Sequence, residues 1–282
     1  MRIRILVDNA ALTDRYYLAE PGFSALVETG DGRVLFDLGY SGAAVENARR
    51  MGEDILGAGY VVLSHGHLDH TWGLFPYIMA MTEARMEERQ VARPTLVAHP
   101  DAFQTKKTGN LPETGSLVAL EKCAEHFEIH LSREPVRLFP GLYFLGEIPR
   151  RYPFEDPGEQ KKRVKRVAGG GLVPDPLLDD SALAYEGREG LVIVTGCAHS
   201  GICNTVARAR EVCGGEKVAD IIGGFHLAGA SPERLERTVD TLRELSVSRM
   251  HPCHCTGEAA ICRLAAAFEV GAVGSGWESE YA

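Results

Sequence analysis

Hydrophobic and polar residues alternate along the first part of the chain in a pattern that predicts β-strands. Residues 3–7 place apolar side chains at every second position, which is the period of a strand with one buried face. Apolar runs at 23–29 and 33–37 flank a Gly-Asp-Gly turn at 30–32, a sequence typical of a β-hairpin. The N-terminal part is therefore predicted to form a sheet.

Further along the chain, short apolar runs alternate with segments of helical periodicity. The helical patterns predict helices over 41–51, 74–86, 202–212, 231–245 and 256–268. The apolar runs predict strands at 60–63, 95–98, 127–131, 136–139, 142–148, 182–185, 191–195, 218–222 and 249–252, with a final strand that ends near Gly276. The expected N-caps of three of these helices are Ser41, Ser231 and Thr256.

Two stretches interrupt this alternation. Residues 104–122 are polar and glycine-rich, which predicts a loop. Residues 149–180 contain five prolines, three consecutive glycines at 169–171 and a basic run at 161–166, so we expect an insertion or lid rather than core. The basic run is either a solvated face or a set of cations for a phosphate or carboxylate substrate.

The alternation of elements predicts a single α+β domain over residues 1–282. Sheets that carry one layer of helices on each outer face would bury the apolar side of both kinds of element. The helix at 74–86 is expected to present one face formed by Leu74, Ile78, Met81 and Arg85.

Charge, hydropathy and cysteine content exclude several classes of protein. The net charge of −9 argues against general binding to nucleic acid or to anionic membranes. No apolar run reaches membrane-spanning length, and the N-terminal apolar stretch is too short for a signal peptide. Seven cysteines, an odd number in a long chain, argue against a disulfide framework. We therefore expect a cytoplasmic protein whose partner is a small-molecule substrate, and the oligomeric state stays open.

One loop contains most of the candidate chemistry. The run Ser-His-Gly-His-Leu-Asp-His at 64–70 follows the strand at 60–63 and precedes the helix at 74–86, so a rigid strand end would aim its side chains. Imidazole suits zinc, iron and manganese, and a carboxylate adds a hard anionic ligand. Within six residues the loop offers four potential metal ligands, namely His65, His67, Asp69 and His70.

Three more histidines, His199, His226 and His254, each come directly after a predicted strand. This shared position suggests that one end of the sheets collects them with the loop at 64–70 into a cleft. Two metal ions about 3.5–4 Å apart would need roughly six protein ligands. The chain supplies about that number.

The run at 64–70 resembles the His-x-His-x-Asp-His signature of the metallo-β-lactamase superfamily. The sequence Phe-Asp-Leu-Gly at 36–39 is similar to that superfamily's upstream strand end, whose aspartate, here Asp37, supports the metal ligands. The order of hairpins, helices and later histidines resembles that fold over nearly the whole chain. The resemblance implies an αββα sandwich of two mixed β-sheets with helices on the outer faces.

A narrower resemblance rests on five further segments, which are 72–74, 179–183, 195–202, 223–227 and 254–257. They are similar to the subgroup called 7,8-dihydropterin-6-methyl-4-(β-D-ribofuranosyl)aminobenzene-5′-phosphate synthase-like. The name of that subgroup implies a pterin or ribose-phosphate substrate.

The superfamily resemblance also implies two divalent metal ions, with zinc as the first choice and iron or manganese as alternatives. The first ion would be held by His65, His67 and His199. The second ion would be held by Asp69, His70 and His254.

The chain departs from the superfamily pattern at two places. Many members carry a histidine in a Gly-His-Thr-Pro-Gly turn and, after the next strand, an aspartate that bridges the metals. Here Asp179 and Asp180 occupy the first place, and Cys197 and His199 occupy the second. Either Asp180 faces the site without bridging, or the two ions bind with unequal affinity.

Several residues are expected beside the ligands, where they would support them or contact substrate, namely Asp37, Asp180, Cys197 and Asn9. Cys197 would be either a soft ligand or a small apolar core residue. His226 would bind substrate or stabilise an oxyanion, or it would be a buried, hydrogen-bonded histidine.

The leading functional hypothesis is a metal-dependent hydrolase that uses a metal-bound hydroxide on a small phosphate-bearing or pterin-like substrate. Asp69 would orient the attacking water and accept a proton, and His226 would stabilise developing negative charge. Three alternatives stay open: a transferase or synthase acting on a pterin or ribose-phosphate compound, an iron-dependent oxidoreductase on the same scaffold, and a non-catalytic metal-binding sensor.

Overall fold

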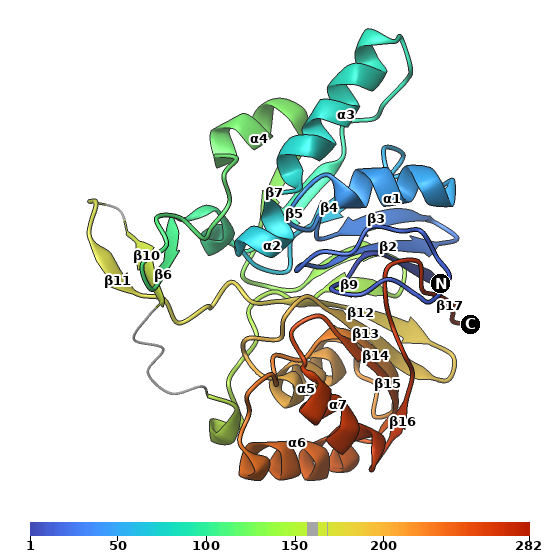
Figure 1. The fold of residues 1–282 in the computed structure, drawn as a ribbon, viewed down its shortest axis with the longest axis vertical. Helices are drawn as coiled ribbons and strands as arrows, with labels where there is room; N and C mark the ends of the chain where they lie inside the picture. The colour runs from blue at the N-terminus through green and yellow to red at the C-terminus, as the bar shows by residue number, and fades with distance from the viewer. Residues whose placement is uncertain (157–162, 168) are drawn as a thin grey trace.

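Two seven-stranded sheets pack face to face, and helices cover both outer faces (Figure 1). The computed structural model describes residues 1–156, 163–167 and 169–282. The predicted α+β fold, an αββα sandwich of two mixed sheets, is confirmed.

The first sheet is built mainly from the N-terminal half of the chain. Its strands are, in spatial order, β17 (Glu278–Glu280), β1 (Arg2–Val7), β2 (Ser24–Thr29), β3 (Gly32–Phe36), β4 (Tyr60–Val62), β5 (Thr95–Ala98) and β7 (Glu128–Leu131). The pairs from β17 to β3 are antiparallel, whereas β3, β4, β5 and β7 run parallel. Its outer face is covered by α1 (Ala43–Met51), α3 (Leu74–Met86) and α4 (Leu120–His126) (Figure 1).

The second sheet comes from the C-terminal half. Its spatial order is β16 (Glu269–Val270), β15 (Val247–Cys253), β14 (Val218–Gly224), β13 (Gly190–Thr195), β12 (Ala182–Gly187), β9 (Leu142–Phe144) and β8 (Val136–Phe139). The four strands from β13 to β16 are parallel, and the others pair antiparallel. Its outer face is covered by α5 (Ile202–Cys213), α6 (Pro232–Glu244) and α7 (Glu258–Ala265).

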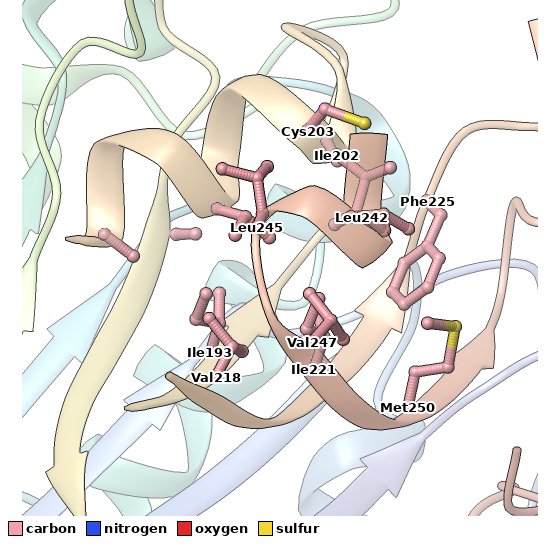
Figure 2. Close-up of a cluster of buried hydrophobic side chains, with 14 of the residues drawn as sticks. Ile193, Ile202, Cys203, Val218, Ile221, Phe225, Leu242, Leu245, Val247 and Met250 are labelled. Atoms are coloured by element: carbon pink, nitrogen blue, oxygen red, sulfur yellow. The ribbon is translucent and has the colours of Figure 1, made fainter. Parts of the chain in front are cut away.

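Three apolar layers hold the sandwich together. Phe36 and Ile222 belong to the layer between the sheets, and Leu35 and Tyr77 belong to the layer between the first sheet and its helices. The third layer packs the second sheet against its helices, and Figure 2 shows Ile193, Ile202, Val218, Ile221, Phe225, Leu242 and Val247 within it. Because β13 and β14 are buried on both faces, their apolar runs are almost unbroken.

The parallel strands bring distant parts of the sequence to one edge. The loops after β3, β4, β13, β14 and β15 all follow carboxyl ends of parallel strands, and β1 runs in the same direction as β3. The loop after β4 leads into the short helix α2 (Leu68–Thr71). This edge carries the histidines that the sequence predicts at strand ends.

A small third sheet lies beside this edge (Figure 1). It contains β6 (Lys106–Thr108), β10 (Arg163–Arg166) and β11 (Leu172–Pro174). Buried ion pairs fix it to the body, because Lys106 Nζ lies 2.9 Å from Asp179 and Lys165 Nζ lies 2.6 Å from Asp101. Within the described residues this sheet is therefore anchored rather than loosely attached.

The prediction for 104–122 is partly wrong, because that stretch supplies β6 and the first turn of α4. Within 149–180, the 3-10 turn Pro153–Glu155 and strands β10 and β11 are described. Residues 157–162 and 168, including the first two lysines of the basic run, lie outside the described residues. The single domain with a lid stays a prediction.

Several predicted details are wrong. The last strand is β17, not a strand that ends near Gly276, and β9 ends at Phe144 rather than continuing to 148. The predicted face of α3 omits Tyr77, which is fully buried and whose hydroxyl donates to the Ile55 carbonyl, so no polar group is left unpaired. Ile78 is partly buried and packs against the same layer. Arg85 is exposed.

Two of the predicted N-caps are also wrong. The N-cap of α1 is Gly42 rather than Ser41. The other error concerns the start of α7. Thr256 does not cap the helix, whose N-cap is Gly257. The Thr256 hydroxyl instead donates to the Cys253 carbonyl and accepts the Phe225 N–H, so it ties two strand ends together. In contrast, Ser231 caps α6 as predicted, because its hydroxyl accepts the Arg234 N–H.

The helices of the described residues are short. None of them has the length and apolar character that a membrane crossing requires.

Truncating a side chain in the layer shown in Figure 2 tests this packing. Leu242 on α6 is fully buried, so Leu242→Ala should lower the free energy of unfolding by about 2–5 kcal/mol in a urea titration. The control, Met86→Ala, changes an exposed residue at the end of α3 and should stay within about 0.5 kcal/mol of the wild type. Equal effects of the two changes would contradict the packing described.

Candidate metal centre

Three imidazole rings converge at the carboxyl ends of β4 and β13. His65 Nε2 lies 3.0 Å from His67 Nδ1, which lies 3.1 Å from His199 Nε2, and the third side of the triangle is 3.2 Å. Three ring nitrogens cannot all satisfy one another, because each hydrogen bond needs one donor and one acceptor. A tetrahedral zinc site with bonds of about 2.0–2.1 Å would separate its nitrogens by about 3.3–3.4 Å, so the triangle fits a metal ion.

The protonation states of these rings agree with that arrangement. Burial, and then the positive charges of neighbouring residues, hold the pKa of His65, His67 and His199 well below the ordinary value of 6.5. The rings are therefore neutral at pH 7, and a neutral imidazole is the form that binds a metal.

A second group lies beside the first and consists of Asp69, His70 and His254. Asp69 Oδ2 lies 3.5 Å from His254 Nε2 and 3.8 Å from His70 Nε2. His254 Nε2 is buried and has no hydrogen-bond partner among the described residues. An unpaired buried nitrogen is costly, and a metal ion at this point would satisfy it.

Hydrogen bonds to the outer side of the rings set their orientation. His70 Nδ1 lies 2.7 Å from Asp37 Oδ2, and His254 Nδ1 lies 2.8 Å from Asn9 Oδ1. Each bond is best made by Nδ1–H, so Nε2 is the nitrogen of each ring that faces Asp69 and is available to a metal ion. Asp37 and Asn9 thus each contact a histidine that the sequence selects as a candidate ligand, and their supporting role at a metal stays a prediction.

The two aspartates at 179 and 180 support the loops and lie outside the candidate ligand groups. Asp179 Oδ2 accepts the Gly66 N–H at 2.8 Å, and Asp180 Oδ2 accepts the Ser200 N–H at 2.7 Å. Burial raises the pKa of Asp180 to about 6. Of the two alternatives for Asp180, this geometry favours a residue beside the site that does not bridge.

His226 and Cys197 also lie close to candidate ligands. The His226 ring centroid is 4.2 Å from that of His199, and its Nδ1 is buried without a partner in the described part of the chain. Cys197 Sγ lies 3.3 Å from His70 Nε2. Cys255, which the sequence analysis did not select, groups with Cys197 and His254 and follows that histidine directly.

The backbone is strained at several of these strand ends. Asp37, Ala198, His226 and His254 all have φ between +49° and +54° although none is glycine. Such left-handed residues cost about 1–3 kcal/mol each and persist where the surrounding structure holds them, often at functional sites. Of these four residues, His226 and His254 line the pocket described next.

The groups open into a pocket of about 350 Å³. His67, Asp69, His199, His226 and His254 line it, whereas His65 and His70 are fully buried behind them. The small sheet and the stretch before α4 add Thr108, Leu111, Thr114 and Arg163 to its walls. Arg163 was part of the predicted basic run, but no sequence signal distinguishes it from the other cations there.

Comparisons with known proteins place this site in a family. The model for the metallo-beta-lactamase superfamily matches residues 18–78. A protein of Methanocaldococcus jannaschii named 7,8-dihydropterin-6-methyl-4-(beta-D-ribofuranosyl)-aminobenzene-5'-phosphate synthase is 31% identical over 91% of this chain and 88% of its own length. The chain belongs to the metallo-β-lactamase superfamily.

Two further proteins resemble the chain over almost its whole length. A solved structure described as a metal-dependent hydrolase of the beta-lactamase superfamily is 28% identical, with a TM-score of 0.83 and coverage of 99% of this chain and 98% of that one. An uncharacterized protein of M. jannaschii is 32% identical over 93% of both chains. The superfamily resemblance read from residues 64–70, and the narrower one to the pterin synthase group, are both confirmed.

The Asp37–His70 contact predicts a pH-dependent stability in the metal-free protein. Burial alone would lower the pKa of His70, but the charges of Asp37 and Asp69 outweigh it and raise the pKa to about 9. Stability from this contact is therefore complete below pH 6.5, the ordinary value, and is lost as pH rises through about 9.

The wild type, after removal of metal by a chelator, should exceed Asp37→Asn in free energy of unfolding by an amount that shrinks between pH 6.5 and 9. Urea titrations at several pH values measure this difference. Asp31→Asn, in an exposed turn, should show a difference that does not change with pH. A constant difference for Asp37→Asn would refute the contact's role.

Proposed function

We propose that this protein is a metal-dependent hydrolase with two divalent metal ions, zinc first among them, that acts on a small phosphate-bearing substrate. One observation carries the proposal: two groups of side chains that could hold a metal ion lie side by side at a single pocket. His65, His67 and His199 would hold the first ion, and Asp69, His70 and His254 the second. The metal-dependent hydrolase that shares 28% identity supports this reading.

Bound metal ions would lower the pKa of water and polarise an oxygen of the substrate. The protein's own residues would do the rest. Asp69 lies between two rings and lines the pocket, so its carboxylate can orient a water molecule and accept its proton. The charges of His70 and His254 outweigh the effect of burial and lower the pKa of Asp69, which keeps it ionised for this role.

His226 would stabilise negative charge that develops on the substrate. Its ring lines the pocket next to His199, and its buried Nδ1 has no partner within the described residues. A nitrogen that is already desolvated gains more from an oxyanion than one hydrated by water.

The position of Arg163 in the pocket supports the proposal that the substrate bears a phosphate. Its guanidinium reaches the pocket from β10, and no carboxylate of the described residues forms an ion pair with it. Nη1 lies 3.3 Å from His199 Nδ1. A ring that binds metal through Nε2 carries its proton on Nδ1 and cannot accept from Arg163, so the guanidinium would be free for a substrate anion.

Two further expectations belong to this proposal. The small sheet would cover a bound substrate, since β10 supplies Arg163 and buried ion pairs hold the sheet in place.

None of the seven cysteines, all within the described residues, forms a disulfide, which supports a reducing, cytoplasmic location.

A synthase is the second candidate, because a relative with 31% identity carries that name. Such an enzyme would use the same pocket to join a pterin to a ribose-phosphate compound instead of adding water. Product analysis by mass spectrometry separates the two, with phosphate esters and lactones in one set of assays and a pterin with a ribose-phosphate acceptor in another.

Removing one ligand of the first group tests the hydrolase proposal. His67→Ala should lose bound metal, measured by elemental analysis, together with hydrolytic activity, because His67 Nδ1 is one corner of the nitrogen triangle. His130→Ala, on the exposed side of β7, should keep both. Normal turnover by a folded, metal-depleted His67→Ala protein would contradict the proposal.

Removing the pocket's cation tests the substrate class. Arg163→Ala should lower kcat/KM for a chromogenic phosphate ester by about 10- to 100-fold, since a charge-assisted hydrogen bond contributes about 1.5–3 kcal/mol. An uncharged ester with the same leaving group should be unaffected. Arg166→Ala is the matched control, because Arg166 lies on the same strand but is exposed. A similar loss for both esters would argue against anion recognition by Arg163.

A further inference from the structure

Cys197 occupies the space between the two groups of candidate ligands. Its Sγ groups with His65 and His70, with His199 and His226, and with His254 and Cys255, and the atoms of each group lie within 4.8 Å of one another. We call His65, His67 and His199 the first trio, and Asp69, His70 and His254 the second. The sulfur is therefore close to nitrogens of His65 and His199 in the first trio and of His70 and His254 in the second. The side chain is buried, with 4% of the residue exposed.

The preceding glycine explains how the sulfur reaches this position. A Cβ at Gly196 would lie 2.1 Å from Ser64 Oγ and 2.7 Å from Asp37 Oδ2. The end of β13 is therefore pressed against the loop that carries the first histidines, which only glycine permits. The next side chain, Cys197, then projects into the space between the trios.

The nearby carboxylates accept hydrogen bonds from other groups, although Asp180 Oδ1 is buried without a partner among the described residues. Asp37 accepts hydrogen bonds from Ser64 and His70, Asp179 from Gly66 and Lys106, and Asp180 from Ser200. Among the described residues, Asp69 is the carboxylate that belongs to a candidate ligand group, and that group is the second trio. No described aspartate or glutamate is thus placed between the two trios.

We propose that the thiolate of Cys197 bridges the two metal ions. The inference rests on the proposed two-metal site and adds a ligand to it. Metal binding would displace the thiol proton to solvent, as metal–cysteine bonds require. A shared thiolate would satisfy both ions with one side chain and link the trios, which otherwise have no common ligand.

A bridging sulfur would also set the metal preference. Thiolates are soft ligands that select zinc, iron or cobalt over magnesium and calcium. The site should therefore retain zinc in the presence of a large excess of magnesium.

Spectroscopy of the wild type provides a test that needs no variant. X-ray absorption at the zinc edge of the fully loaded protein should show a sulfur neighbour at about 2.3 Å in addition to nitrogen and oxygen. Loaded zinc with only nitrogen and oxygen neighbours would overturn the inference while leaving the proposed metal site intact. A protein that binds no zinc would instead overturn the proposed function itself.

Cobalt substitution then assigns the sulfur to one residue. The cobalt-loaded wild type should bind two ions per chain and show a sulfur-to-cobalt charge-transfer band in the near ultraviolet. Cys197→Ser should lose the band and bind the second ion at least about 10-fold more weakly. Cys197→Asp, which restores an anionic bridge, should keep two ions without the band, and it also serves if Cys197→Ser does not fold.

Two cysteine variants complete the comparison. Cys255→Ser removes the neighbouring thiol, and Cys262→Ser removes an exposed one on α7. Both should keep the charge-transfer band and two cobalt ions. A band that persists in Cys197→Ser or Cys197→Asp, or that disappears in Cys255→Ser, would overturn the assignment to Cys197.

Discussion

The buried carboxylate of Asp37 is the contact on which the rest of the site depends. It accepts hydrogen bonds from the Ser64 N–H, the Ser64 hydroxyl and His70 Nδ1, and the Ser64 hydroxyl lies 2.9 Å from His65 Nδ1. This chain of bonds places a ring proton of His65 and of His70 on Nδ1, so Nε2 is the nitrogen of each ring that is available to a metal ion. Because an unpaired buried carboxylate is costly, β3 and the histidine loop can be buried only together.

Much of this centre is predictable from the sequence because its parts share one local feature. His65, His199 and His254 each follow an apolar run, and parallel strands that lie side by side end at the same edge of a sheet. Proximity in space therefore follows from position relative to strands. Asp37 and Asn9 are placed by the same reasoning, since they too follow strands that run in this direction.

The walls of the pocket could not be predicted in this way. β6 and β10 are short and polar, so they carry no hydrophobic period, and buried ion pairs such as Lys106 with Asp179 hold them instead. Those partners are 73 residues apart in sequence. Likewise, nothing local shows that Arg163 rather than its basic neighbours faces the pocket. Contacts between charged side chains that are distant in sequence produce no periodic pattern of hydrophobic residues, so they cannot be predicted from such a pattern.

The pairing of β17 with β1 joins the two ends of the described chain, and it has a consequence for the order of assembly. Residues 2–4 align with 278–280, and Asp8, just beyond β1, accepts the N–H of His254. Contacts of such sequence separation form late, because loop-closure entropy opposes them until much of the chain is in place. A growing chain that exposes only the loop at 64–70 would hold a metal weakly. Full affinity for the proposed metal ions would therefore be reached only after both ends of the described chain have folded.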